Sequence, residues 1–166
     1  MKAQEILETP LGRMVAIADN KALYFLNFID LNLEHEIKRL ERKVKTTITP
    51  GSTEPIDSIK AELDQFFEGT LKEFKTPMCL VGTPFQISVW EELQKIPFGE
   101  TRSYLDIATA IGKPTAYRAV AQANGANLIP IVIPCHRVVN HNGDLGGYSA
   151  GLGRKKWLLN HEKNRG

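Results

Sequence analysis

The sequence predicts an α+β protein with two parts, a small α+β module over residues 1–80 and a mainly helical domain over residues 81–166. Two observations predict this division. The first half holds two runs of apolar and β-branched residues around a turn, a pattern typical of a β-hairpin. The second half holds helix-start signals followed by apolar residues at helical spacing. A chain of 166 residues is long enough for one ordinary domain or two small ones.

The first half is expected to alternate strands and helices. Asp19 and Asn20 provide turn chemistry between the two apolar runs. Gly69 is a stop signal after a run with helical period. The expected strands cover residues 11–17, 23–29, 46–49 and 71–80, and the expected helices cover residues 31–45 and 55–68. We find no catalytic set of residues in this half.

The second half begins with two strong helix starts. Thr83 is an expected N-cap, and Gln86 three residues later completes a capping box for a helix that reaches about residue 95. Ser103 and Asp106 repeat this arrangement at the start of the next helix.

A third helix is expected over residues 116–123, with Thr115 as its cap. Two short helices joined by a turn that contains Gly112 form the helix-turn-helix pattern, although many helix pairs only pack together. This helix carries small residues at Ala116, Ala119, Ala121 and Ala123. Small side chains let a helix come close to a partner, and the projecting Arg118 can insert into it.

Charge is unevenly spread along the chain. The net charge is +2, but residues 1–78 hold 11 Lys/Arg and 13 Asp/Glu, whereas residues 79–166 hold 10 Lys/Arg and 6 Asp/Glu. A basic half is compatible with a polyanionic partner such as nucleic acid. The two cysteines, Cys79 and Cys135, form neither a disulfide framework nor a zinc set. With no apolar run of membrane-span length and no export signal, we expect a cytoplasmic protein.

Within residues 129–139, apolar residues lie on both sides of Cys135, His136 and Arg137. This pattern predicts a buried segment. Burying reactive side chains is costly unless they have a task or partners. Because its two prolines cannot donate ladder hydrogen bonds, we expect a stiff, extended segment that presents Cys135. A thiol needs a base or a positive field to become a nucleophile, and His136 could supply it directly or through a water.

A glycine-rich loop follows over residues 140–151, and such loops allow close approach of a ligand to the backbone. A last helix then begins at Leu152 and carries Glu162 near its end.

These motifs together resemble the O6-alkylguanine-DNA alkyltransferase family. The resemblance rests on Ile133–Val138 around Cys135. It is supported by residues 83–90, 97–104, 118–120, 127, 146–149 and 157–162. It covers residues 82–163 closely and residues 1–80 only in outline. It implies a ribonuclease-H-like N-terminal module and a C-terminal alkyltransferase domain with a winged or helix-turn-helix DNA-binding motif.

The resemblance implies DNA repair by direct reversal. Cys135 would take the alkyl group from O6-alkylguanine, and possibly from O4-alkylthymine, after the base is flipped out of the duplex. His136, bridged by a water and oriented by Glu162, would generate the thiolate. Because a thioether has no easy route to hydrolysis, each molecule would act once.

The resemblance also assigns binding residues. Those expected to bind the substrate base are Tyr104, Asn127, Val138, Tyr148 and Ser149, and those expected to contact DNA are Thr115, Ala116, Tyr117, Arg118 and Ala119. Asn127 resembles a hinge residue, and Arg118 would take the vacated place in the stack. Tyr117 stands where the family usually has a smaller residue. The expected partner is duplex DNA, with a monomeric protein, no membrane, no cofactor and no metal.

Two other classes of protein remain open from the residues alone. A cysteine hydrolase could use Cys135, His136 and Glu162, and it would turn over many times, whereas a repair transferase titrates one to one. A non-catalytic binder of alkylated DNA would lack the reactive cysteine, which this chain keeps. A helix-turn-helix regulator of the related adaptive-response type would need an additional cysteine-rich zinc module.

Overall fold

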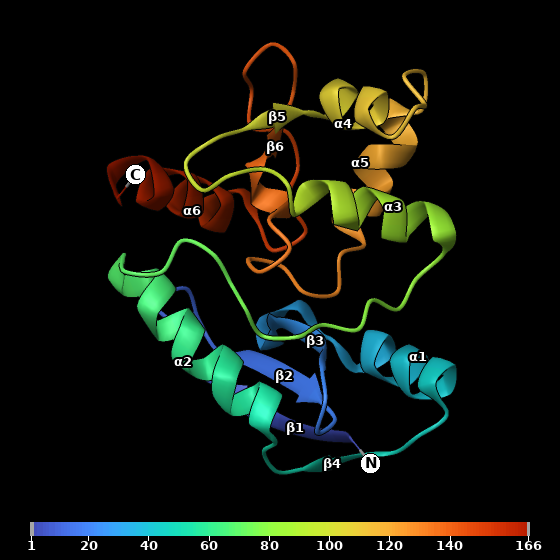
Figure 1. Ribbon diagram of the computed structural model, residues 1–166, viewed down its shortest axis with the longest axis vertical. Coiled ribbons are helices and arrows are strands. Elements are labelled where there is room, and N and C mark those ends of the chain that lie inside the picture. Colours follow the sequence, from blue (N-terminus) through green and yellow to red (C-terminus); the bar gives the residue numbers. More distant parts are fainter. Residues whose placement is uncertain (1, 166) are drawn as a thin grey trace. The chain divides into compact units, whose positions relative to one another are not determined.

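Figure 1 shows the computed structural model of the chain, which describes residues 2–165. The chain forms two compact units, Met1–Val81 and Gly82–Gly166. Among the described residues, no helix is both long and apolar enough to cross a membrane.

The first unit is built on a four-stranded mixed sheet. Its strands are β1 (Lys2–Leu7), β2 (Met14–Ala18), β3 (Leu23–Phe28) and β4 (Ile48–Pro50), in the spatial order β3-β2-β1-β4. The β1–β2 and β2–β3 pairs are antiparallel, and β4 joins β1 in parallel. The expected hairpin is therefore present as β2 and β3, with Met14 opposite Phe28.

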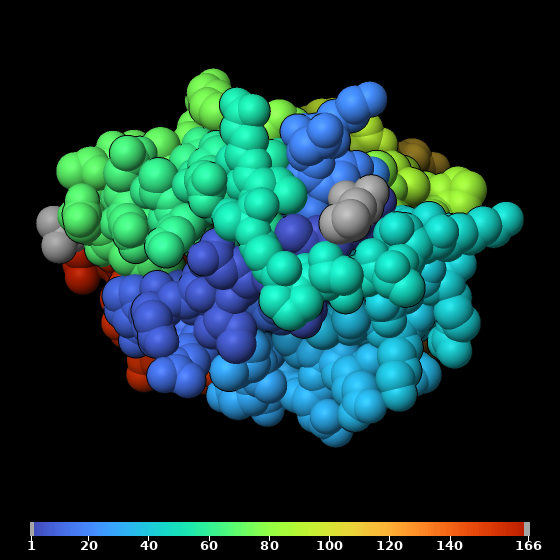
Figure 2. Space-filling model, turned by 90° about the horizontal axis from the view of Figure 1, so that it is seen from below, coloured from blue at the N-terminus to red at the C-terminus, as the bar shows by residue number. Residues whose placement is uncertain are grey.

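Two helices, α1 (Glu34–Val44) and α2 (Glu54–Glu68), follow the hairpin, after a single 3-10 turn, η1 (Ile29–Leu31). The inner face of α2 buries apolar side chains at helical spacing, namely Ile56, Ile59, Leu63 and Phe66. Gly69 ends α2 in a left-handed conformation, with φ 88°, as its position in the sequence predicts. Figure 2 shows one face of this unit, where the dark-blue β1 reaches the surface beside the teal segment that leads into α2.

One expectation for this unit is wrong, one strand differs in its bounds, and one strand was not expected. The described residues 71–80 form no strand. Pro77 and Cys79 form backbone hydrogen bonds with Leu23 alone, around an isolated bridge. The amides of Lys75 and Thr76 donate to the Glu62 carboxylate and not to a neighbouring strand. The strand expected over residues 46–49 is β4, which begins only at Ile48. In addition, β1 was not expected, because its polar residues obscure the alternation that marks a strand.

The second unit is mainly helical. Its helices are α3 (Pro84–Leu93), α4 (Tyr104–Ala110), α5 (Tyr117–Gly125) and α6 (Leu152–Arg165). Two short parallel strands, β5 (Arg102–Ser103) and β6 (Val138–Val139), and a 3-10 turn, η2 (Cys135–Arg137), complete it. Figure 1 shows α3, α4 and α5 grouped together, and α6 on the other side of the β5–β6 pair.

The helix starts at Thr83 and Ser103 are confirmed. Each side chain accepts a hydrogen bond from the amide three residues on, and the side chain at that position bonds back to the cap amide. Thr115 is not a cap. The N-cap of α5 is Ala116, which makes no side-chain cap bond, because the chain enters the helix through a tight turn in which the Ala116 amide donates to Lys113.

Trp90 ties the helices of this unit together. Its ring is buried, and its Nε1 donates to the carbonyl of Ala123 at 2.8 Å. Val89 and Leu93 on α3 and Val120 on α5 are buried with it. The tryptophan therefore places α5 against α3 through one directed bond as well as through packing.

Candidate functional site

The Cys135 segment is held by its own backbone turns. It is not the extended stretch expected from its prolines. Ile131 has φ 75°, an unusual value for a β-branched residue, and the Ile133 amide donates to Ile129 at 2.9 Å. Cys135 then opens η2, and its amide donates to Ile133 at 2.7 Å. A backbone strained at Ile131 persists only where its surroundings fix it, so Cys135 occupies a defined position.

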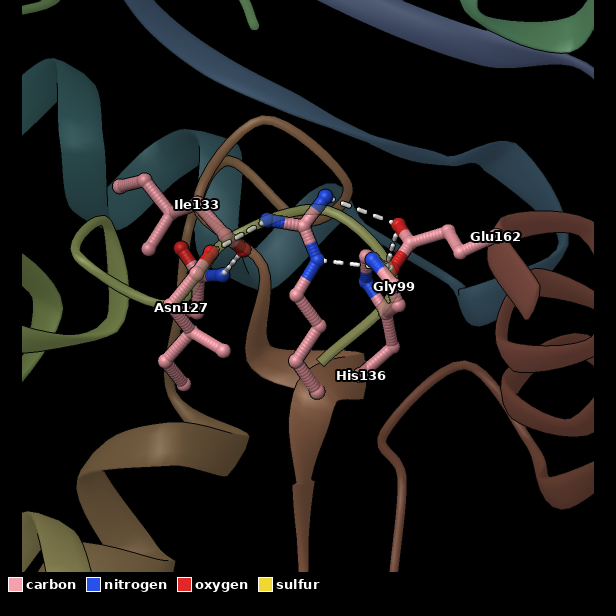
Figure 3. A network of polar contacts seen from close by, with 7 residues as sticks. Gly99, Asn127, Ile133, His136 and Glu162 are labelled. Carbon is pink, nitrogen blue, oxygen red and sulfur yellow. Dashed lines mark hydrogen bonds and ion pairs between the residues drawn. The ribbon is translucent and has the colours of Figure 1, made fainter. Parts of the chain in front are cut away.

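Two buried asparagines connect α5 to this segment. The Asn127 Nδ2 donates to the Ile133 carbonyl at 2.8 Å, and its Oδ1 accepts from the Ile129 amide at 3.0 Å. Figure 3 shows Asn127 beside Ile133. The Asn124 Nδ2 donates to the Cys135 carbonyl at 3.2 Å. A movement of α5 is thereby coupled to the backbone that carries the thiol. Sequence reasoning missed Asn124, although it lies three residues before Asn127.

Glu162 organises the charged centre of the site. Its carboxylate lies 2.6 Å from His136 Nε2 and accepts from Arg137 at 2.8 and 2.9 Å. It also accepts from the Gly99 amide at 3.4 Å, as Figure 3 shows. Arg137 additionally donates to the Ile96 carbonyl at 2.7 Å. The side chains of His136, Arg137 and Glu162 are all buried, so most of their hydrogen bonds and charge pairs are made with one another.

The protonation of His136 follows from these contacts. A carboxylate only accepts hydrogen bonds, so Nε2 carries the hydrogen and Nδ1 is the acceptor. Nδ1 has no hydrogen-bond partner among the described residues. Burial lowers the pKa of His136, and Glu162 only partly opposes this. The ring is therefore neutral at neutral pH and can accept a proton at Nδ1.

Burial alone would raise the pKa of Glu162, but hydrogen bonds and charges from His136 and Arg137 reverse this and hold the pKa at about 2. The carboxylate therefore stays ionised throughout the neutral range.

The Cys135 thiol is 1 % exposed. Burial raises the pKa of this thiol, whereas the nearby polar groups of Asn127, Lys155 and Tyr148 oppose the rise. The structure therefore holds the thiol buried and protonated, which protects it from other reactions.

A cavity of about 490 Å³ opens beside this centre. One side belongs to α5, through Tyr117, Arg118 and Ala121, and the other to the glycine-rich loop. Of the residues expected from the sequence, those that line it are Tyr104, Tyr117, Arg118, Tyr148 and Ser149. Those outside its lining are Thr115, Ala116, Ala119, Asn127, Val138 and the three expected catalytic residues, Cys135, His136 and Glu162. Asn124, which lines the cavity, donates to the Cys135 carbonyl.

Gly146 lets the loop close over Tyr104. It has φ 70°, and a Cβ there would lie 3.1 Å from the Tyr104 hydroxyl. Such a position suits only glycine, for both conformational and steric reasons. Burial and then the neighbouring Cys135 raise the pKa of Tyr104, so the hydroxyl keeps its proton and can donate a hydrogen bond into the cavity.

Lys155 is a further site residue, and it was missed from the sequence. Its side chain is fully buried, and Nζ donates to the carbonyls of Val138 at 2.7 Å, Gly147 at 3.0 Å and Leu145. Burial lowers its pKa to about 8, and Cys135 opposes this. Lys155 shares the buried stripe of α6 with Leu158 and Glu162 at helical spacing, but its position between Arg154 and Lys156 gives no sign of burial in the sequence. Lys155 joins β6 to the glycine-rich loop and places a positive charge near the thiol.

The arrangement suits a nucleophilic thiol held next to the wall of the cavity, because Asn124 and Tyr148 line the cavity and interact with Cys135. Between residues 2 and 165, no three His, Cys, Asp or Glu side chains cluster as metal ligands. The thiol is buried and His136 offers a neutral acceptor, which favours attack by the thiol on an electrophilic carbon. The basic Arg118 on α5 favours an anionic partner as the carrier of that carbon.

Sequence comparison gives a consistent picture. Residues 84–164 match the family model of the 6-O-methylguanine DNA methyltransferase DNA-binding domain. The chain is 40% identical to a methylated-DNA–protein-cysteine methyltransferase of Methanosarcina barkeri over 160 residues, 96% of each chain. It is 41% identical to the constitutive enzyme of that description from Bacillus subtilis, over 94% of this chain and 92% of the relative.

Structural comparison agrees. The crystal structure of Mycobacterium tuberculosis OGT in complex with DNA superposes with a TM-score of 0.85 at 37% identity, over 98% of this chain and 94% of that chain. The O6-methylguanine-DNA methyltransferase of Pyrococcus kodakaraensis superposes with a TM-score of 0.68 at 26% identity, over 98% of this chain and 99% of that chain.

Proposed function

The chain belongs to the O6-methylguanine-DNA methyltransferase family, and from this premise we propose that Cys135 is the residue that accepts the alkyl group. The protein repairs DNA by direct reversal, as a methylated-DNA–protein-cysteine methyltransferase that moves the alkyl group of O6-alkylguanine in duplex DNA to its own cysteine. The observation that carries the assignment is the buried Cys135 thiol, which lies against Tyr148 of the cavity and is followed in the chain by His136, paired with Glu162.

His136 acts as the base for the thiol. Its Nδ1 accepts the thiol proton through a water molecule, while Glu162 fixes the ring through Nε2. The lowered pKa of His136 keeps Nδ1 available at neutral pH. Lys155 favours the thiolate by its charge, which opposes the rise that burial causes in the pKa of Cys135.

The transfer is a single displacement at the alkyl carbon. The bond from Sγ to carbon forms, the bond from carbon to O6 breaks, and its electron pair stays on O6. The proton taken from the thiol is then available on His136 for the guanine anion, so no proton is consumed. No tetrahedral intermediate forms, which is why the chemistry needs no oxyanion hole.

The flipped base is held by groups on both sides of the cavity. Tyr104 donates to guanine N3 and the Ser149 amide to O6, where negative charge develops. The carbonyls of Cys135 and Val138 accept from the exocyclic amine. The Cys135 carbonyl already accepts from Asn124 Nδ2 and from the Val138 amide, and the Val138 carbonyl accepts from Lys155, so the exocyclic amine shares these acceptors with the protein.

DNA binding is assigned to the helix pair α4 and α5, as a helix-turn-helix with the β5–β6 pair in the place of a wing. The α5 helix enters the minor groove, its small residues Ala119 and Ala121 allow close approach, and Arg118 fills the vacated position in the stack. This assignment is supported by the exposure of all three residues and by Arg118 and Ala121 in the cavity wall.

The first unit is assigned a ribonuclease-H-like fold. The support is its strand order, β3-β2-β1-β4, with an antiparallel β1–β2–β3 meander and β4 added in parallel beside β1. No catalytic role is assigned to this unit.

The test of the nucleophile compares two cysteine variants with methylated duplex DNA. Cys135→Ala should lose alkyl transfer completely and keep DNA binding, and Cys79→Ala should keep both. Transfer by Cys135→Ala would overturn the assignment. Repeated turnover by the unchanged protein would instead favour a cysteine hydrolase that uses the same three residues.

A further inference from the structure

One exposed residue of α5 is aromatic. Ala119, Ala121 and Gly125 are exposed on this helix and are small, whereas Arg118 and Gln122 are exposed and long. Tyr117, on the first turn, is also exposed, at 45 % of its surface. The exposed face of α5 therefore combines small residues with two long polar side chains and one aromatic ring.

Tyr117 lies at the edge of the candidate active site. It lines the same cavity as Tyr104 and Ser149. The guanidinium carbon of Arg118 lies 6.0 Å from the centre of the Tyr117 ring, at the outer limit of a cation–π contact. The ring and the arginine are thus neighbours at the cavity mouth, on the helix assigned to DNA.

When α5 binds DNA, the Tyr117 ring needs a gap in the duplex that can accommodate it. Between the helix and an intact groove it would hold the small residues away from the duplex. A flipped base changes this, because it leaves a gap and unstacks its neighbours. Proteins of the minor groove commonly insert apolar wedges at such unstacked steps. An aromatic ring can stack on any base, since every base has a π-face.

We propose that Tyr117 is an aromatic wedge that works beside Arg118: Arg118 takes the place of the flipped base, and the Tyr117 ring stacks on the base next to the gap. This inference rests on the proposed function and specifies how this chain holds its duplex open. The ring stabilises the flipped state and takes no part in the transfer to Cys135.

The experiment measures alkyl-transfer rates with two substrates, a methylated duplex and free O6-benzylguanine. Only the duplex has neighbouring bases to stack on. Tyr117→Ala should react about tenfold more slowly with the duplex, the loss typical of one base–aromatic contact, and should react normally with the free base. Tyr117→Phe keeps the ring and should match the unchanged protein on both substrates.

Leu152→Ala is the matched control. Leu152 is 54 % exposed on the same unit and is absent from the cavity lining, so its removal should change neither rate. The free base also serves as the test of folding, because a misfolded variant would lose that reaction as well.

Two results would overturn the inference. Equal or faster duplex repair by Tyr117→Ala would make the ring a bystander or an obstruction. Equal losses on both substrates would mean that the ring serves the base site or the fold. Failure of the unchanged protein to take a benzyl or methyl group would contradict the proposed function itself, and the same rate measurements separate that result from the other two.

Discussion

The Nε2 atom of His136 lies 2.6 Å from the Oε2 atom of Glu162, and neither side chain is more than 1 % exposed. The same carboxylate pairs with Arg137. One acidic side chain therefore orients the base of the site and also neutralises a buried guanidinium. Its loss should affect both the chemistry and the stability.

Glu162→Gln keeps the size of the side chain but removes its charge. Arg137 is then left as a buried cation without a counter-charge, and we expect the free energy of unfolding to fall by about 3–5 kcal/mol. Because His136 loses the group that fixes its tautomer, alkyl transfer should slow by about a hundredfold or more. Urea unfolding and single-turnover rates measure the two effects.

Glu100→Gln is the control for this change. Glu100 pairs with Arg102 at 3.1 Å on the surface, where an ion pair contributes at most about 1 kcal/mol. If Glu162→Gln were as stable and as fast as Glu100→Gln, the role given to the buried carboxylate would be wrong.

The pKa of Glu162 predicts how stability depends on pH. The folded value of about 2 lies below the ordinary value of 4.5. The carboxylate therefore stabilises the fold fully above pH 4.5, and this contribution is lost as the pH falls from 4.5 towards 2. It amounts to about 3 kcal/mol at most. Urea unfolding at neutral pH and near pH 3 should show a fall in stability that is smaller in Glu162→Gln. An identical fall in both proteins would contradict the assignment.

Local signals allowed much of the second unit to be predicted from the sequence. The capping boxes at Thr83 and Ser103 depend on residues only three apart, so the sequence contains the whole interaction. Thr115 has the same residue type at a similar place, yet it does not cap α5, because the turn from Lys113 already sets the entry to that helix. Residue type alone therefore does not show whether a helix begins with a side-chain cap or with a backbone turn.

The features that the sequence did not predict depend on contacts between distant segments. The segment over residues 71–80 is apolar enough for a strand, but the neighbours it meets are Leu23 and the Glu62 carboxylate, which do not form a ladder. Lys155 lies between Arg154 and Lys156 and looks like part of a solvated basic run. Only the tertiary structure shows the carbonyls of β6 and the loop that surround it.

Lys155→Met tests the connection between α6 and the glycine-rich loop. Methionine fills similar space but leaves three carbonyls without their donor, so the free energy of unfolding should fall by about 2–4 kcal/mol. Alkyl transfer should slow for both duplex DNA and the free base, because the loop wall of the cavity loosens. The neighbouring Lys156 is exposed, and Lys156→Met should leave stability unchanged. Equal stability of the two variants would rule out the structural role of Lys155.

Gly146→Ala tests the close approach of the loop to Tyr104. The new Cβ would meet the hydroxyl at 3.1 Å at a residue with φ 70°, so we expect a loss of about 1–2 kcal/mol and slower transfer as Tyr104 moves. Gly147→Ala is the control in the same loop, since a Cβ there would meet nothing within 4 Å. Thermal unfolding and transfer rates of the two variants should differ, and matching values would argue against the steric account.

The mass of the intact protein after incubation with methylated duplex DNA tests the central assignment most directly. We predict a gain of one methyl group per molecule, saturating at one equivalent and located on the peptide that contains Cys135. Release of methanol with an unchanged protein mass would contradict it, and so would a methyl group on Cys79.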